Sequence, residues 1–151
     1  LLLALRLVDT MPDFDTQFEP DDVLKPLQIL TPTIDIIWCA QLRPLQEIHT
    51  MREVAEMWLW RSRARELQRL GIAPQPGISF PEIIRWMAHK GWQEGKLDAP
   101  VNGDFPAFGK AYADLNDDEY NLISSITHER FFILNWMSEL SAEWESIRVD
   151  G

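Results

Sequence analysis

The stretch "PLQEIHTMREVAEMWLWRSRARELQRL", residues 44–70, decides the fold of this chain. Proline is tolerated in the first turn of a helix, and Gly71 stands where a left-handed C-cap belongs. Spacings of three and four relate the residues of one face, which is apolar except for a serine: Ile48, Met51, Ala55, Trp58, Leu59 and Ser62. The stretch therefore predicts a long helix from about residue 44 to 70.

A second long helix is predicted over about residues 117–140. Asn116 as N-cap, with Glu119 three residues later, is the signature of a capping box. The predicted core stripe of this helix advances by three or four and contains one charged residue: Ile123, Ile126, Arg130, Ile133, Met137, Leu140 and Trp144. Arg130 is therefore the residue that needs an explanation.

Shorter elements surround these two helices. Ser79 and Glu82 form a second capping-box pattern and predict a helix that ends near Gly91 or Gly95. We expect residues 1–9 to end an apolar helix and residues 9–22 to form a loop. A short helix is predicted within 23–30, and 31–41 is helical or irregular.

Residues 95–115 are rich in glycine and proline, which predicts a long ordered loop with one short helical turn near 110–114. The fold class is therefore all-α, with two long helices packed antiparallel or obliquely and several shorter helices around them. At 151 residues, the chain fits a single domain over 1–151.

Composition and charge narrow the classes of partner. The chain has 24 acidic and 14 basic side chains and a formal charge of −10, so its field repels phosphate backbones. We therefore expect no nucleic-acid partner. A negative surface is compatible with a basic protein partner, or simply with solubility.

Cellular location is inferred from two features. Cys39 is the only cysteine, so no internal disulfide can form and a reducing, cytosolic compartment is expected. The opening "LLLALRLV" is too short to span a bilayer, so we expect no membrane association. Because the first residue is not methionine, we expect that an N-terminal portion precedes this sequence.

Patterns for metal or cofactor chemistry are incomplete. His49 and Glu53 stand four residues apart on one predicted helix face, but one such pair supplies only two ligands. Cys39 lacks a local nucleophile motif, and the glycine-containing segments lack phosphate-loop spacing. We therefore expect no metal and no cofactor.

Arg130 leaves two interpretations open. A charge on a buried stripe is costly unless it is paired, so we expect a partner from this set: Glu47, Glu53, Glu56, Glu129 or Asn135. Arg61 could play the same part on the other long helix. Such a network would tie the two long helices together.

Alternatively, a polar cluster could bind an anion or substrate in a cleft lined by Trp58 and Trp136; its members would be Arg61, Glu129, Arg130 and Asn135. The same tryptophans could simply fill the core.

The leading expectation for function is a non-enzymatic cytosolic binding or interaction protein with an acidic surface. The alternative is an enzyme or a small-anion-binding protein that uses the Arg/Glu/Asn cluster in the tryptophan-lined cleft. A homodimer is also possible, because a patch of exposed tryptophans would be stabilised by burial in an interface.

Three segments of the chain resemble the family called domain of unknown function 4272. They are "LLLALRLVD", residues 42–61 with Trp58 and Arg61 in a W-x-x-R pattern, and "ERFFILNWM" followed by Trp144. The family often has a histidine directly after the "ER" pair, where this chain has Phe131, so the resemblance assigns no acid–base role there. It implies no established activity.

Overall fold

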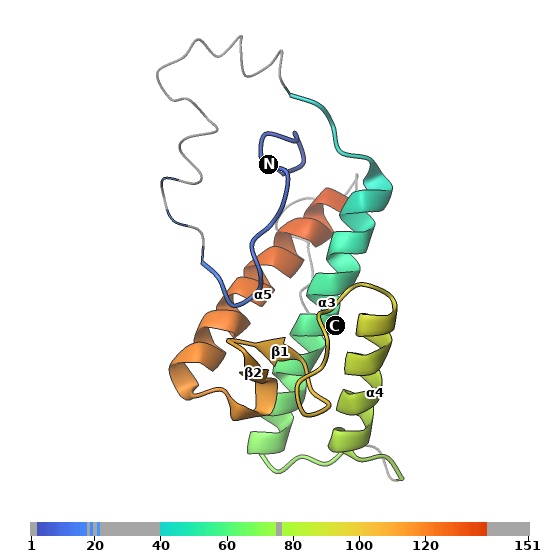
Figure 1. The fold of residues 1–151 in the computed structure, drawn as a ribbon, viewed down its shortest axis with the longest axis vertical. Coiled ribbons are helices and arrows are strands. Elements are labelled where there is room, and N and C mark those ends of the chain that lie inside the picture. Colours follow the sequence, from blue (N-terminus) through green and yellow to red (C-terminus); the bar gives the residue numbers. More distant parts are fainter. Residues whose placement is uncertain (1–2, 18, 20, 22–39, 75–76, 139–151) are drawn as a thin grey trace.

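The computed structural model describes residues 3–17, 19, 21, 40–74 and 77–138, and these residues are mostly helical. Its helices are α3 (Leu45–Arg69), α4 (Phe80–Gln93) and α5 (Asp117–Ser138). Between α4 and α5 lie β1 (Pro106–Ala107), β2 (Lys110–Ala111) and the 3-10 helix η1 (Tyr112–Asp114). Helices α3 and α5 pack obliquely and run in opposite directions, and α4 lies along another side of α3 (Figure 1).

The long helix predicted over 44–70 is confirmed as α3. Its N-terminus follows Pro44, and its C-terminus closes in a Schellman motif at Gly71, whose φ is +68°. In that motif the N–H of Ile72 donates to the carbonyl oxygen of Leu67 at 3.0 Å. The predicted face is buried, with Met51 half-buried at its edge.

Helix α4 is also confirmed. Ser79 precedes it, but the Ser79 hydroxyl donates to the carboxylate of Glu82 at 2.6 Å and makes no cap to the backbone. The helix ends at Gln93, and Gly95 takes the left-handed conformation (φ +68°). Gly91 packs closely on its neighbours, because a Cβ there would lie 2.5 Å from Cε of Met57 and 2.9 Å from Cγ of Leu97.

The start of α5 follows its predicted capping box. The Asn116 side-chain oxygen accepts the N–H of Glu119 at 2.9 Å, and the Asn116 N–H donates to the Glu119 carboxylate at 2.8 Å. The pKa of Glu119 is lowered by its hydrogen bond to Lys110 and then by the Asn116 N–H. The predicted extension to residue 140, including Leu140 and Trp144, lies outside the described residues.

The buried face of α5 differs from the predicted stripe. The buried residues are Ile123, Thr127, Phe131 and Leu134, so apart from Ile123 the true stripe is the neighbouring one. Ile126 and Arg130 are only half-buried at its edge. Since the two stripes share Ile123 and both are rich in apolar residues, their spacing alone does not distinguish them.

The loop predicted over 95–115 contains a small β-hairpin that the sequence analysis missed. Strand β1 pairs antiparallel with β2, and an isolated bridge joins Val101 to Asp104. Each connection has two residues with positive φ, Asn102–Gly103 and Phe108–Gly109, as a type I′ turn requires. The predicted helical turn near 110–114 is confirmed as η1.

The helix expected over residues 1–9 is wrong for the described part, because residues 3–8 form turns and bends. Arg6 is left-handed (φ +53°), which interrupts a right-handed helix. The carbonyl groups of Leu3 and Val8 instead accept hydrogen bonds from the Arg43 side chain. The predictions for 23–30 and for most of 31–41, including Cys39, lie outside the described residues.

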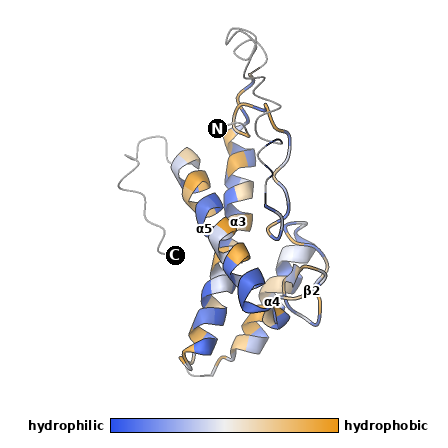
Figure 2. Ribbon diagram, turned by 90° about the vertical axis from the view of Figure 1, so that its left-hand side faces the viewer, coloured by the Kyte–Doolittle hydropathy of each residue, from blue (hydrophilic) through white to orange (hydrophobic). Residues whose placement is uncertain are grey.

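The core has two parts, both built on α3. One gathers aromatic side chains of α3 and of the segment after α4, including Trp58, Phe105 and Tyr112. The other joins α3 to α5 through Ile48, Leu59 and Phe131, with others. Both long helices accordingly carry alternating hydrophobic and hydrophilic bands (Figure 2).

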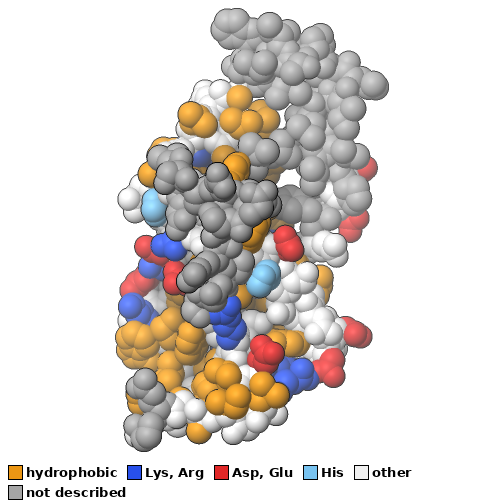
Figure 3. Space-filling model, turned by 180° about the vertical axis from the view of Figure 1, so that it is seen from behind, with side chains coloured by type: hydrophobic (Ala, Val, Ile, Leu, Met, Phe, Trp, Pro, Cys, Tyr) orange, Lys and Arg blue, Asp and Glu red, His pale blue; other side chains and the backbone are white. Residues whose placement is uncertain are grey.

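Not all large hydrophobic side chains are covered. On the face opposite to that of Figure 1, hydrophobic side chains gather towards the lower end, and charged side chains of both signs lie interspersed beside them (Figure 3). Leu67, Leu70 and Ile72, at the end of α3, are exposed, as are Trp86 and Trp92 of α4.

Candidate functional site

Arg130 holds the N-terminal segment, defined here as residues 3–17. Its Nη1 donates to the carbonyl oxygen of Pro12 at 2.7 Å, and its Nη2 donates to that of Asp13 at 3.0 Å. The guanidinium also lies over the ring of Phe14, 4.5 Å from its centroid. Burial lowers the pKa of Arg130, and the charge of Asp13 acts in the opposite direction.

The expectation that Arg130 pairs with an acidic or amide side chain is wrong. Glu47, Glu53, Glu56, Glu129 and Asn135 were the candidates, whereas main-chain carbonyl oxygens accept its hydrogen bonds. This is physically sufficient because Arg130 is only half-buried, and carbonyl dipoles and an aromatic face both stabilise a partly hydrated cation.

A row of aromatic rings runs inward from Arg130. Phe14 stacks on Trp58, with ring centroids 5.1 Å apart and an interplanar angle of 15°. Trp58 is tilted against Tyr112 at 6.1 Å, and Arg61 lies 4.5 Å above the centre of the Tyr112 ring. Arg130 and Arg61 thus lie at opposite ends of one row of three rings.

A cavity of about 340 Å³ opens beside this row. We call it the Trp58 cleft. Apolar side chains from the N-terminal segment, from α3 and from the segment after α4, including β1, line it: Met11, Phe14, Met51, Val54, Trp58, Leu97 and Pro106. The charged residues that line it are Asp13, Asp15, Lys96, Asp98 and Arg130.

The cations of the Trp58 cleft are already engaged. Lys96 Nζ lies 2.8 Å from a carboxylate oxygen of Glu94 and 3.0 Å from one of Glu53. These hydrogen bonds, first to Glu94 and then to Glu53, raise the pKa of Lys96. Arg130 keeps its positive charge, because its hydrogen bonds go to neutral carbonyl oxygens, and the charge of Asp13 stabilises it. The lining therefore has an excess of carboxylates, since Lys96 is paired with Glu94 and Glu53, which lie outside it.

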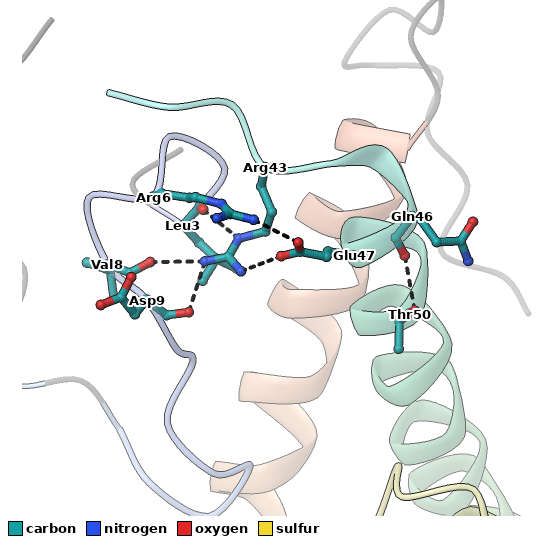
Figure 4. Close-up of polar contacts among 8 residues, drawn as sticks. All are labelled: Leu3, Arg6, Val8, Asp9, Arg43, Gln46, Glu47 and Thr50. Carbon is teal, nitrogen blue, oxygen red and sulfur yellow. Dashed lines mark hydrogen bonds and ion pairs between the residues drawn. The ribbon is translucent and has the colours of Figure 1, made fainter. Parts of the chain in front are cut away.

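Arg43 holds the outer end of the N-terminal segment (Figure 4). Its guanidinium donates to the carbonyl oxygens of Leu3, Val8 and Asp9 and to the carboxylate of Glu47. Arg43 and Arg130 together make five hydrogen bonds to main-chain carbonyl oxygens of this segment. They position the wall of the cleft that carries Asp13, Phe14 and Asp15.

The buried ion pair that we expected at Arg130 is found at Arg61. Arg61 is 1% exposed, and its Nε and Nη2 each lie 2.7 Å from an oxygen of Asp104. The Asp104 carboxylate also accepts the backbone N–H groups of Phe105 and Ala113. This pair joins α3 to the segment after α4, and it does not join α3 to α5.

Polar contacts between α3 and α5 involve other residues. The hydroxyl groups of Ser62 and Ser124 lie 3.0 Å apart, and Arg69 pairs with Asp117 near the lower ends of the helices. Arg52 Nη1 donates to the Asn135 side chain at 3.4 Å. The two long helices are thus tied by several weaker contacts.

The predicted site residues are distributed over different surroundings. Arg61 belongs to the buried Asp104 network, Arg130 lines the Trp58 cleft, and Asn135 contacts Arg52. Glu129 is exposed on α5. Of the two predicted pocket tryptophans, Trp58 lines the cleft, whereas Trp136 is half-buried outside its lining.

Several functional candidates were missed from the sequence. Asp104 follows Asn102–Gly103, a dipeptide that signals a tight turn and could have drawn attention to it. Arg43 and Phe14 gave no such signal, because a guanidinium that binds carbonyl groups and a ring that stacks on a distant tryptophan leave no local spacing.

Neither known proteins nor metal-binding groups add chemistry to the site. No family model, curated protein or solved structure matches the chain. Within the described ranges, no group of three or more His, Cys, Asp or Glu side chains could hold a metal ion. No helix among the described residues is long and apolar enough to cross a membrane.

Proposed function

We propose that this protein is a non-enzymatic binding protein whose Trp58 cleft receives a cationic side chain from a basic segment of a protein partner. The observation that carries this function is the charge distribution around the cleft. Three carboxylates, those of Asp13, Asp15 and Asp98, lie among its apolar walls. They outnumber its two cations, Arg130 and Lys96, and Lys96 is already paired with carboxylates outside the lining.

A lysine or arginine side chain matches both parts of such a cleft. Its methylene stem can pack on the rings of Phe14 and Trp58, while its charged end faces the carboxylates. Asp13 and Asp98 are exposed, so their charges remain accessible from solvent. The Asp15 carboxylate is less available to a partner, because one of its oxygens already accepts the N–H of Phe108 at 2.7 Å.

The charge of the whole chain supports the same class of partner. At −10, the protein attracts basic surfaces at long range and accelerates their encounter, an effect that salt screens. The same charge opposes an anionic ligand in this cleft. The small-anion alternative is further disfavoured at Arg130, whose two terminal nitrogens donate to main-chain oxygens.

The test is a binding titration of the full chain with a lysine-rich peptide, followed by calorimetry and by chemical-shift mapping. We expect shifts around the Trp58 cleft and an affinity that falls as salt increases. The double variant D13N/D98N should bind about two- to thirtyfold more weakly, since exposed charge pairs contribute about 0.2–1 kcal/mol each.

Glu129→Gln is the matched control, because Glu129 is an exposed carboxylate on α5 outside the lining of the cleft. It should leave the affinity nearly unchanged. Equal weakening by E129Q and D13N/D98N, or tighter binding of a glutamate-rich peptide, would contradict the proposed function.

Family and location are also part of this proposal. The three segments that resemble domain of unknown function 4272 support membership of that family, which brings no activity with it. The single cysteine supports a cytosolic location.

A further inference from the structure

The buried guanidinium of Arg61 has a donor that Asp104 does not use. Nε and Nη2 donate to Asp104, whereas Nη1 is buried and has no hydrogen-bond partner among the described residues. Buried donors in proteins are nearly always paired, because an unpaired one loses its hydration without compensation. An oxygen atom of a ligand would give Nη1 of Arg61 the hydrogen-bond acceptor that it lacks.

Arg61 is one of the residues that line a cavity of about 250 Å³ between the second half of α3, the first half of α4 and the turn at Asn102–Gly103. Its polar lining consists of Arg61, Gln68, Arg85, Asn102, Asp104 and Asp114. None of these residues lines the Trp58 cleft, so the two cavities are separate.

The lining carries two cations, Arg61 and Arg85, and two carboxylates, Asp104 and Asp114, and Arg65 adds a further positive charge nearby. The charge around the cavity is therefore positive, although the chain as a whole is acidic. Asp104 is already neutralised by Arg61 and by two backbone N–H groups. Arg65 lies close by and donates to the carbonyl oxygens of Tyr112 and Leu115. Its pKa is lowered first by burial and then by the positive charges of Arg69 and Arg61.

Arg85 is an exposed cation in the lining of this cavity. It is exposed on α4 and packs over the turn, with its Nε 3.3 Å from the position that a Cβ of Gly103 would occupy. Because Nη1 of Arg61 is covered, a ligand oxygen can reach it only if part of the lining shifts. Arg85 can shift and then pair with the ligand from the solvent side.

We propose that this cavity binds a small monocarboxylate, with one oxygen on Nη1 of Arg61 and the other on the guanidinium of Arg85. Guanidinium groups bind carboxylates and phosphates alike. The carboxylate of Asp114 in the same lining would repel a phosphate dianion more strongly than a single carboxylate charge. This site is independent of the proposed partner binding at the Trp58 cleft.

The experiment is a titration of the full, isotope-labelled chain with sodium acetate, at constant ionic strength kept with sodium chloride. We expect saturable shifts of the amide signals of Asn102, Gly103 and Ala113. Arg85→Ala should weaken binding about tenfold or more, as expected for the loss of a charge-assisted hydrogen bond. Asp114→Asn should strengthen it severalfold by removing a like charge.

Lys90→Ala is the matched control, because Lys90 is another exposed cation of α4 outside this lining. It should leave acetate binding unchanged. Non-saturable shifts, an unaltered affinity in a well-folded R85A variant, weaker binding in D114N, or equal losses in K90A and R85A would each overturn the proposal. Tighter binding of inorganic phosphate than of acetate would overturn the ligand class.

Discussion

At the scale of single residues, Asp104 has the largest expected effect on stability. It pairs with Arg61 through two contacts of 2.7 Å, and both side chains are almost fully buried. Asp104→Asn leaves the guanidinium charge buried without a counter-charge. We expect it to lower the free energy of unfolding by about 3–5 kcal/mol, measured by urea denaturation.

Asp117→Asn is the control for that substitution. Asp117 also pairs with an arginine of α3, Arg69, but both side chains are largely exposed. Exposed pairs contribute no more than about 1 kcal/mol, so D117N should change stability little. If D104N and D117N lower the free energy of unfolding by similar amounts, burial is not the reason why the Arg61–Asp104 pair stabilises the protein.

Residue type alone did not determine which arginine is paired with an acid. A buried guanidinium must be compensated, and both Arg61 and Arg130 were predicted to lie near the core. The identity of the compensating group could not be predicted, because Asp104 lies 43 residues from Arg61 and Pro12 lies 118 residues from Arg130. Such partners are set by tertiary packing.

At the scale of secondary-structure elements, the start of α5 is the clearest local determinant. Asn116→Ala removes the side-chain oxygen that accepts the N–H of Glu119 at 2.9 Å. We expect a loss of about 1 kcal/mol, which for a chain of this size lowers the melting temperature by about 2–4 °C. The measurement is thermal unfolding followed by circular dichroism.

Asn121→Ala is the comparison within the same helix. Asn121 is exposed in the body of α5, where alanine has the higher helix propensity, so this variant should be as stable as the wild type or slightly more. If N121A destabilises the protein as much as N116A does, capping is not the cause.

Helices could be predicted from the sequence better than their faces or the hairpin. The bounds of α3 and the start of α5 follow from proline, glycine and capping residues within a few positions of each end. The buried face of α5 depends on what α3 presents to it, so Thr127, with 0% exposure, was not expected in the core. Strands of two residues leave no periodicity to detect.

At the scale of the whole molecule, the N-terminal segment couples distant parts of the chain. Phe14 stacks on Trp58, while the neighbouring Asp15 accepts the N–H of Phe108 near the hairpin. Phe14→Ala should loosen the segment and lower the free energy of unfolding. The loss should not exceed about 1.5–3 kcal/mol, which is the free energy gained when a phenylalanine side chain is fully buried. Hydrogen exchange at the Phe108 amide should become faster.

Leu42→Ala is the control for the segment. Leu42 is 82% exposed just before α3, so its truncation should change stability by less than about 0.5 kcal/mol and leave the Phe108 amide as protected as before. An F14A variant with unchanged exchange at Phe108 would show that stacking on Trp58 is not what keeps the segment docked.

The contacts by which Arg43 and Arg130 hold residues 3–13 also determine which amino-acid substitutions this stretch tolerates. Both arginines bind the peptide carbonyl, a group that every amino acid carries. Positions such as Val8 and Asp9 can therefore accept many substitutions while the chain keeps its path, whereas exchanging either arginine for lysine removes the forked donor geometry. The sequence of residues 3–13 can therefore diverge during evolution as long as Arg43 and Arg130 are retained.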